Sequence, residues 1–119
     1  MSHITIGNMG EKAAIHYLTE KGYTIIHSNY RTKIGEIDII AQQKNVLVFA
    51  EVKTRRNKNY GTPAEAVTYR KRQKIVQTAY YYLKQSGRMD SLCRFDILEI
   101  LLDNQNRCHV YHIINAFGE

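Results

Sequence analysis

The 119-residue sequence lacks several features that mark particular classes of protein. It has no apolar run long enough to span a bilayer, and residues 1–10 lack the basic start and hydrophobic middle of a signal peptide, so we expect a cytoplasmic protein with no membrane partner. It contains no glycine-rich phosphate loop and no internal repeat. Only two cysteines are present, and their predicted positions on neighbouring strands favour free thiols over a disulfide.

Acidic residues are scarce relative to basic ones. Eleven Asp and Glu against seventeen Lys and Arg give a formal net charge of +6, which favours a polyanionic partner. Within residues 53–74, the single acid Glu65 stands among eight of the seventeen bases. We predict that this tract contacts the phosphate backbone of DNA, although a solvated helix face has the same pattern. The bases are Lys53, Arg55, Arg56, Lys58, Arg70, Lys71, Arg72 and Lys74.

Residues 34–54 predict a β-hairpin. The segments Ile34 to Ala41 and Val46 to Thr54 are rich in β-branched and aromatic residues, and the polar segment between them suits a tight turn. We expect Lys44 and Asn45 to form a two-residue turn, with Asn45 tolerating a positive φ. Gln43 then lies opposite the first residue of the second strand.

This register brings acidic residues together. Counting outward from the turn places Asp38 opposite Glu51 and Glu36 opposite Lys53, with facing Cβ atoms roughly 5 Å apart. Two carboxylates at that distance repel each other unless a cation or a proton lies between them. We therefore predict that Asp38 and Glu51 bind Mg²⁺ or Mn²⁺, that Lys53 assists an attacking water, and that Glu36 is a further candidate. A cross-strand ladder of salt bridges is the alternative interpretation.

The N-terminal region predicts a helix from Asn8 to Lys21, with Asn8 as its N-cap and Gly22 just beyond its end. Glu11 then has two interpretations. It either completes a capping box with Asn8, or it reaches along the apolar stripe of the helix toward the acidic hairpin.

The rest of the chain predicts one small α/β domain. Its 44% hydrophobic content is enough for a single core, so we expect residues 1–119 to form a central mixed sheet of about five strands flanked by helices. The further elements that we expect are a strand from Tyr23 to Ser28, a connection from Asn29 to Arg31, a helix start at Thr62 to Glu65, a helix from about Tyr69 to Gln85 ended by Gly87, and strands from Cys93 to Leu102 and Cys108 to Asn115.

Several side chains outside the hairpin have two interpretations. Arg31 and Lys33 either contact phosphate or are solvated loop cations. One of the tyrosines at 80–82 either stacks on an unpaired base or packs at the rim of the core. Asp96 either assists the acidic site or forms a structural salt bridge with Arg94 or another neighbour.

Asp38, followed by Glu51-Val52-Lys53 after an apolar strand, matches the Asp…Glu-x-Lys core of the restriction-endonuclease-like nuclease superfamily, which includes the archaeal Holliday-junction resolvases. With further motifs, the chain resembles the YraN-like family of predicted endonucleases over roughly residues 7 to 100. Those motifs are Gly10-Glu11, Asn29-Tyr30-Arg31, Gly35-Glu36-Ile37-Asp38, Val48 to Arg55, Tyr60-Gly61-Thr62-Pro63 and Arg94-Phe95-Asp96. Ile37 stands where the superfamily often has proline, and Ala50 where we expect valine, but neither is a proposed ligand.

The resemblance implies a restriction-endonuclease-like fold and a metal-dependent phosphodiesterase acting on DNA. Glu11, Asp38 and Glu51 would hold Mg²⁺ or Mn²⁺, and Lys53 would assist the nucleophile or transition state. The likeness to junction resolvases further implies branched or junction DNA as substrate and a homodimer, because opposed cuts need two sites. The alternative is a non-catalytic nucleic-acid-binding module, and a third interpretation is a protein-interaction domain. Acids beside phosphates favour the enzyme, and the basic tract disfavours the interaction domain.

Overall fold

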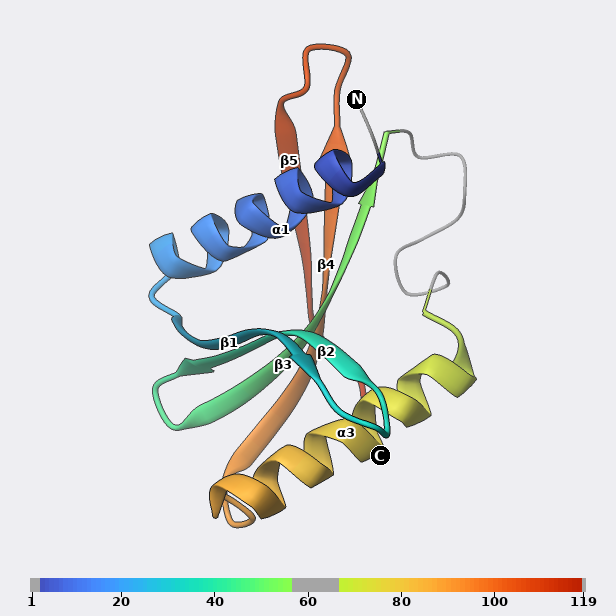
Figure 1. Cartoon of the computed structure of the whole chain (residues 1–119). Coiled ribbons are helices and arrows are strands. Elements are labelled where there is room, and N and C mark those ends of the chain that lie inside the picture. The colour runs from blue at the N-terminus through green and yellow to red at the C-terminus, as the bar shows by residue number, and fades with distance from the viewer. Residues whose placement is uncertain (1–2, 57–66, 119) are drawn as a thin grey trace.

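The computed structural model describes residues 3–56 and 67–118 (Figure 1). Its elements are α1 (His3–Glu20), β1 (Thr24–Arg31), β2 (Glu36–Gln43), β3 (Val46–Arg55), α3 (Tyr69–Ser86), β4 (Leu92–Leu102) and β5 (Cys108–Phe117). The strands in these residues form one five-stranded sheet in the order β1-β2-β3-β4-β5. Strands β3 and β4 are parallel, whereas the other neighbours are antiparallel. The predicted α/β class with a mixed sheet flanked by helices is confirmed.

Helices α1 and α3 cover opposite faces of the sheet (Figure 1). Alternate side chains of β3 show this directly: Leu47 and Phe49 pack in the core beneath α3, while Val48 and Ala50 pack in the core beneath α1. A strand that is covered on both faces is apolar on both faces. The charged residues that follow Ala50 in β3 therefore mark the place where the strand extends beyond the two apolar cores.

Helix α1 is longer than the sequence predicted. It begins at His3 and not at Asn8, so the predicted N-cap lies inside the helix and cannot form a capping box with Glu11. Its end is as expected, because Gly22 has a φ of 93° and its amide donates to the Thr19 carbonyl at 3.1 Å. Asparagine and glycine are weak helix formers, which favoured a start at Asn8. Packing of the helix against the sheet overrides that local preference.

Gly10 allows α1 to lie against β3. A Cβ atom added at Gly10 would lie 1.9 Å from the hydroxyl oxygen of Thr54 and 2.8 Å from its Cβ. Alanine is the better helix former by roughly 1 kcal/mol, but an approach this short forces the helix away from the strand. We predict that Gly10→Ala lowers the free energy of unfolding by about 1–3 kcal/mol in urea denaturation, the usual cost of overpacking.

Gly7 provides the matched control for this prediction. It lies in the same helix, and a Cβ added there meets no atom within 4 Å. Gly7→Ala is therefore expected to stabilise the protein by up to roughly 1 kcal/mol through helix propensity alone. Equal stability of the two variants would show that the approach of α1 to Thr54 is not restrictive.

The hairpin of β2 and β3 has the predicted register. Gln43 pairs with Val46 across the turn at Lys44 and Asn45. The positive φ, 54°, belongs to Lys44 and not to Asn45, where we expected it. The turn length and the alternation of apolar residues fixed the register even though the conformation of the turn itself was assigned to the wrong residue.

Strand β1 extends to Arg31, so the prediction that Asn29 to Arg31 form a connection is wrong. Arg31 pairs with Glu36, and the true connection is residues 32–35. There the Thr32 hydroxyl accepts hydrogen bonds of 3.1 and 3.2 Å from the amides of Ile34 and Gly35. A threonine hydroxyl that organises a turn in this way is a local signal, and it places the end of the strand after Arg31.

Helix α3 agrees with its prediction to within one residue. Thr68 is its N-cap, and Gly87, with a φ of 72°, is its C-cap. Among its three consecutive tyrosines, Tyr82 is buried, whereas Tyr80 and Tyr81 are 54% and 41% exposed. The helix therefore presents two tyrosine rings to solvent.

The closing hairpin separates the cysteines as predicted. Cys108 pairs with Leu102, whereas Cys93 pairs with Leu47 at the far end of β4. Both cysteines are free thiols. Neither α1 nor α3, the helices of the described residues, is long and apolar enough to cross a membrane.

Candidate metal and nucleic-acid site

The acidic end of the hairpin lies where β2 and β3 separate. Their backbone pairing ends at Ile39 opposite Ala50. One step beyond, Oδ2 of Asp38 accepts a 2.7 Å hydrogen bond from the Val52 amide, and the Asp38 carboxyl also shares a hydrogen bond with Glu51. The Asp38 side chain thus takes the place of a backbone carbonyl at the end of the ladder. Asp38 and Glu51 come together as the sequence predicted.

Glu51 places an ionisable group in a buried position, since its residue is only 6% exposed. Burial, the hydrogen bond to Asp38 and the charge of Asp38 raise the pKa of Glu51 from 4.5 to about 8, against the opposing effects of Lys71 and Lys53. Nζ of Lys71 lies 3.4 Å from Oε1 of Glu51. From the sequence we predicted Lys71 only as a DNA-binding base, because no pattern in the neighbouring residues indicates that α3 places it beside the hairpin.

Lys53 and Lys71 supply the positive charge at this point. Burial, and then the hydrogen bond and charge of Lys71, lower the pKa of Lys53. For Lys71, burial lowers the pKa, but the charge of Glu51 and the hydrogen bond with Lys53 outweigh it and the pKa is raised. Lys71 therefore favours the ionised form of Glu51, and Lys53 is the amine that loses its proton more readily.

The free energy of unfolding of the metal-free protein should decrease as the pH rises, because of Glu51. The unfolded chain loses this proton near pH 4.5, whereas the folded protein keeps it to about pH 8, so the free energy of unfolding decreases as pH rises through that window. We predict that Glu51→Gln gains stability over the wild type by up to about 1.4 kcal/mol per pH unit there. Urea denaturation of both proteins in EDTA across this window measures the difference, and parallel pH profiles would contradict it.

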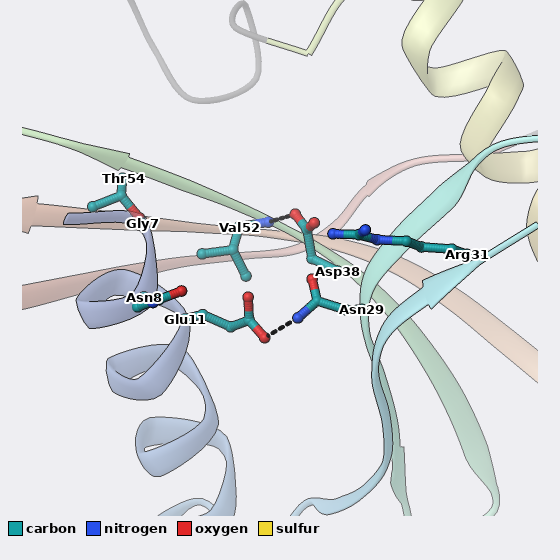
Figure 2. A pocket seen from close by; sticks show the side chains of 8 residues that line it. All are labelled: Gly7, Asn8, Glu11, Asn29, Arg31, Asp38, Val52 and Thr54. Atoms are coloured by element: carbon teal, nitrogen blue, oxygen red, sulfur yellow. Dashed lines mark hydrogen bonds between the residues drawn. The ribbon is translucent and has the colours of Figure 1, made fainter. Parts of the chain in front are cut away.

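A cavity of about 430 Å³ lies between α1 and strands β1 to β3 (Figure 2). Glu11 enters it from α1 and accepts a 2.7 Å hydrogen bond from Nδ2 of Asn29. Figure 2 shows the Arg31 side chain extending toward Asp38. Of the two interpretations of Glu11, the structure excludes the capping box and places the carboxylate in a cavity with Asp38. The lining residues are Gly7, Asn8, Glu11, Asn29, Arg31, Asp38, Val52 and Thr54.

Asp38 connects the two parts of the site, because it contacts Glu51 and lines the cavity with Glu11. Within residues 3–56 and 67–118, no three acidic, histidine or cysteine side chains lie close enough together to form a metal centre of their own. The Asp38–Glu51 pair still fits Mg²⁺, which is commonly held by one or two carboxylates and completes its shell with water and substrate phosphate. Glu11 is a third carboxylate in reach of the same cavity.

Some of the basic and acidic candidates have structural partners instead. Arg55 donates to Glu99, and both side chains are largely buried. Nε of Arg72 donates to the Val67 carbonyl at 2.8 Å. Glu36, which we expected opposite Lys53, lies 3.6 Å from Arg31 across β1 and β2, because the β2–β3 ladder ends before it.

The remaining basic candidates are largely on the surface. Arg70 and Lys74 line a hollow of about 520 Å³ on α3. Nη2 of Arg56 donates to the Asn106 side chain at 3.0 Å while staying exposed. Lys58 and the predicted helix start at Thr62 to Glu65 lie outside the described residues. Among the described candidates for DNA binding, the exposed ones are Arg31, Lys33, Arg56, Arg70 and Lys74.

Asp96 belongs to a buried ionic network and not to the acidic pair. It is fully buried and accepts hydrogen bonds of 2.9 and 2.8 Å from Arg94. Nε2 of His112 lies 2.7 Å from Asp96, and its Nδ1 lies 3.1 Å from the Tyr17 hydroxyl. The salt bridge that we weighed for Asp96 is present. The whole network joins β4 and β5 to α1, and no local pattern in the sequence indicates the part played by His112 and Tyr17.

These features define a small α/β domain whose mixed sheet carries paired carboxylates and lysines where its central hairpin opens. A family model described as "Uncharacterised protein family UPF0102" matches residues 10–100, and the chain belongs to that family. This confirms the resemblance to the YraN-like family.

Curated relatives cover almost the whole chain. A UPF0102 protein of Caldanaerobacter subterraneus subsp. tengcongensis is 49% identical over 115 residues, which cover 95% of this chain and 94% of the relative. One from Clostridium acetobutylicum is 46% identical over 93% of this chain and 92% of the relative. One from Caldicellulosiruptor saccharolyticus is 39% identical over 98% of this chain and 100% of the relative.

Proposed function

We propose that this protein is a divalent-metal-dependent phosphodiesterase that cleaves DNA, acting as an endonuclease. The supporting observation is the Asp38–Glu51 carboxyl pair, set beside Lys53 and Lys71 at the open end of a hairpin. Glu51 is buried and Asp38 is half-buried, and a cation can take the place of the proton in the hydrogen bond between their carboxyl groups. Asp38 and Glu51 would hold Mg²⁺ or Mn²⁺, and Glu11 would act from the far side of the cavity.

The cation would supply charge stabilisation at the phosphate and activation of a water. Lys53, whose pKa is lowered, is suited to orient that water or accept its proton. When DNA binds, Lys71 would give up part of its contact with Glu51 and contact the phosphate instead. The phosphate carries a negative charge, as does the ionised Glu51 carboxylate. Arg31 extends into the cavity beside Asp38 and would position the DNA strand by binding one of its phosphate oxygens.

DNA is the substrate that the surface charge supports. Arg70 and Lys74 are exposed on α3, the helix that also supplies Lys71, so a backbone bound along the helix would pass the carboxyl pair. Contacts of this kind position a nucleic acid without reading its sequence. We therefore propose that branched or junction DNA is preferred over a particular duplex sequence, and that two copies of the chain make the opposed cuts.

A non-catalytic nucleic-acid-binding module is the second candidate function. The observation in its favour is the contact between Lys71 and Glu51, because a lysine can neutralise the acidic site without any metal ion. The protein would then keep its basic surface and bind DNA without cutting it.

An assay on matched substrates separates these two functions. Linear, flapped, single-stranded and four-way DNA of shared sequence would be incubated with the protein in Mg²⁺, Mn²⁺ or EDTA. We expect metal-dependent cutting that is strongest on the branched forms. Equal cutting of all four would remove the preference for branches, whereas binding without cutting of any substrate would support the non-catalytic module.

Neutralising the exposed bases of α3 should reduce the salt dependence of DNA binding. We predict that Arg70→Gln combined with Lys74→Gln flattens the slope of log K against log salt by roughly 0.9 for each phosphate of duplex DNA that the variant no longer neutralises. Lys44→Gln is the control and should leave the slope unchanged, because exposed Lys44 lies in the turn between β2 and β3, at the closed end of the hairpin. Fluorescence anisotropy in EDTA measures all three proteins, and equal slopes would place the DNA surface elsewhere.

A further inference from the structure

A further hollow, distinct from the one at Arg70 and Lys74, shares Arg31 with the carboxylate cavity. It measures about 630 Å³, within the range of roughly 300–1,000 Å³ typical of ligand pockets. The 32–35 loop after β1 forms one side and α3 forms the other, and Figure 1 shows the two lying beside each other. The lining residues are Tyr30, Arg31, Thr32, Lys33, Ile34, Tyr81 and Gln85.

The walls of this hollow are held in place before any ligand binds. The Thr32 hydroxyl organises its loop, and a Cβ at Gly35 would lie 2.8 Å from the Thr78 hydroxyl of α3, so the loop lies directly against the helix. Tyr30 packs edge-on against Tyr82, with ring centroids 5.4 Å apart. A pocket that exists in the free protein needs little ordering when it binds.

The chemistry of the hollow combines exposed apolar surface with positive charge. Tyr81 is 41% exposed and Ile34 is 37% exposed, an arrangement that leaves both open to a flat apolar group. Arg31 and Lys33 supply the cations at the same hollow. Aromatic side chains interleaved with bases are the usual means of holding single-stranded nucleic acid, in which each base stacks on a ring and each phosphate meets a cation.

Gln85 adds a polar group to the same hollow. Its Oε1 accepts a 3.0 Å hydrogen bond from the Tyr30 hydroxyl. That bond uses one of the two lone pairs of the carbonyl oxygen and orients the amide, whose nitrogen can donate to an acceptor on a base edge. Stacking with a hydrogen bond at the rim suits a nucleobase better than it suits an aliphatic ligand.

We propose that this hollow binds one unpaired nucleobase of the DNA substrate, stacked on Tyr81, while Arg31 holds the phosphate that joins it to the strand in the carboxylate cavity. The proposal rests on the proposed DNA substrate, and it names the feature of that substrate that the protein recognises. A base can enter the hollow only where the duplex is open, as at a fork, a flap or a junction. Recognition of branched DNA would then come from capture of an unpaired base beside the scissile phosphate.

Binding measured without metal tests this proposal separately from cleavage. The probes are a forked duplex with 2-aminopurine at its first unpaired position and a fully paired duplex of the same sequence, both in EDTA. We expect Tyr81→Ala to weaken binding of the fork by roughly 5- to 150-fold, the effect of losing one stacked base, and to leave binding of the paired duplex unchanged. Tyr81→Phe keeps the ring and should bind the fork like the wild type, with the same quenching of 2-aminopurine.

Tyr80→Ala is the matched control, because Tyr80 is 54% exposed on the same helix but lines a different hollow with Cys93 and Phe95. It should bind both probes like the wild type. Ile34→Ala tests the loop side of the hollow and should weaken binding of the fork alone. The proposal is overturned if Tyr81→Ala and Ile34→Ala bind the fork as Tyr80→Ala does, or if they weaken binding of both probes equally. If these variants lose affinity for the fork alone but the protein never cuts DNA, the base site is upheld and the nuclease is rejected. If the protein cuts DNA but the variants bind the fork like the wild type, the nuclease is upheld and the base site is rejected.

Discussion

Glu51→Gln is expected to lower the rate of metal-dependent DNA cleavage by at least about a hundredfold. Changing a group that merely supports a metal ligand typically costs 10- to 100-fold, and Glu51 is proposed as a ligand itself. The substitution preserves the size of the side chain and removes its negative charge. Calorimetric titration with Mn²⁺ in the presence of DNA should show weaker metal binding in the same variant.

Asp38→Asn should have a comparable effect on cleavage while keeping the fold. Its side-chain oxygen can still accept the hydrogen bond from the Val52 amide, so the end of the hairpin should stay in place. Glu20→Gln is the control, because that exposed carboxylate of α1 pairs with the exposed His16 across one helical turn, away from the hairpin. Wild-type activity in both Asp38→Asn and Glu51→Gln would mean that the observed cutting arises at another site or from a contaminant.

Asp96→Asn is expected to lower the free energy of unfolding by about 3–5 kcal/mol near neutral pH. Removing one partner of a buried ion pair leaves the other charge uncompensated, and the Arg94 side chain is only 19% exposed. The same change weakens the link from Asp96 through His112 to Tyr17 on α1. Urea denaturation measures the loss.

The effect of Asp96→Asn should shrink at acidic pH. Burial raises the pKa of Asp96, but the hydrogen bonds from His112, Arg94 and Asn115 outweigh it and hold the pKa below its usual value of 3.8. A lowered pKa in the folded protein gives a contribution to stability that is complete above pH 3.8 and is lost as pH falls through the folded-state value. The wild type and the variant should therefore converge in acid.

Asp103 is the matched control for Asp96. It too pairs with an arginine and a histidine, Arg107 and His109, but both of those partners are exposed. Solvent screens such pairs, so Asp103→Asn should cost far less than Asp96→Asn. Equal losses in the two variants would show that burial of the Asp96 network is not the source of its energy.

The sequence by itself determined the features that depend on neighbouring residues. Two polar residues between apolar strands fixed the pairing of Gln43 with Val46, and with it the meeting of Asp38 and Glu51. Gly22 and Gly87 end their helices because a residue without a Cβ adopts a positive φ at low cost. Such rules act over a few residues, and the five-stranded mixed sheet follows from the order of elements that they define.

Only the tertiary structure decided which groups meet across long separations in the chain. Glu11 is a carboxylate of the cavity and not part of a capping box, because α1 packs across β3 at Gly10. Lys71 lies 3.4 Å from Glu51, and Arg55 becomes the counter-ion of the buried Glu99, although these two bases look alike in the sequence. The cause is physical: burial makes a charge costly unless a partner is near, and that partner is chosen by how the elements pack, which no local pattern encodes.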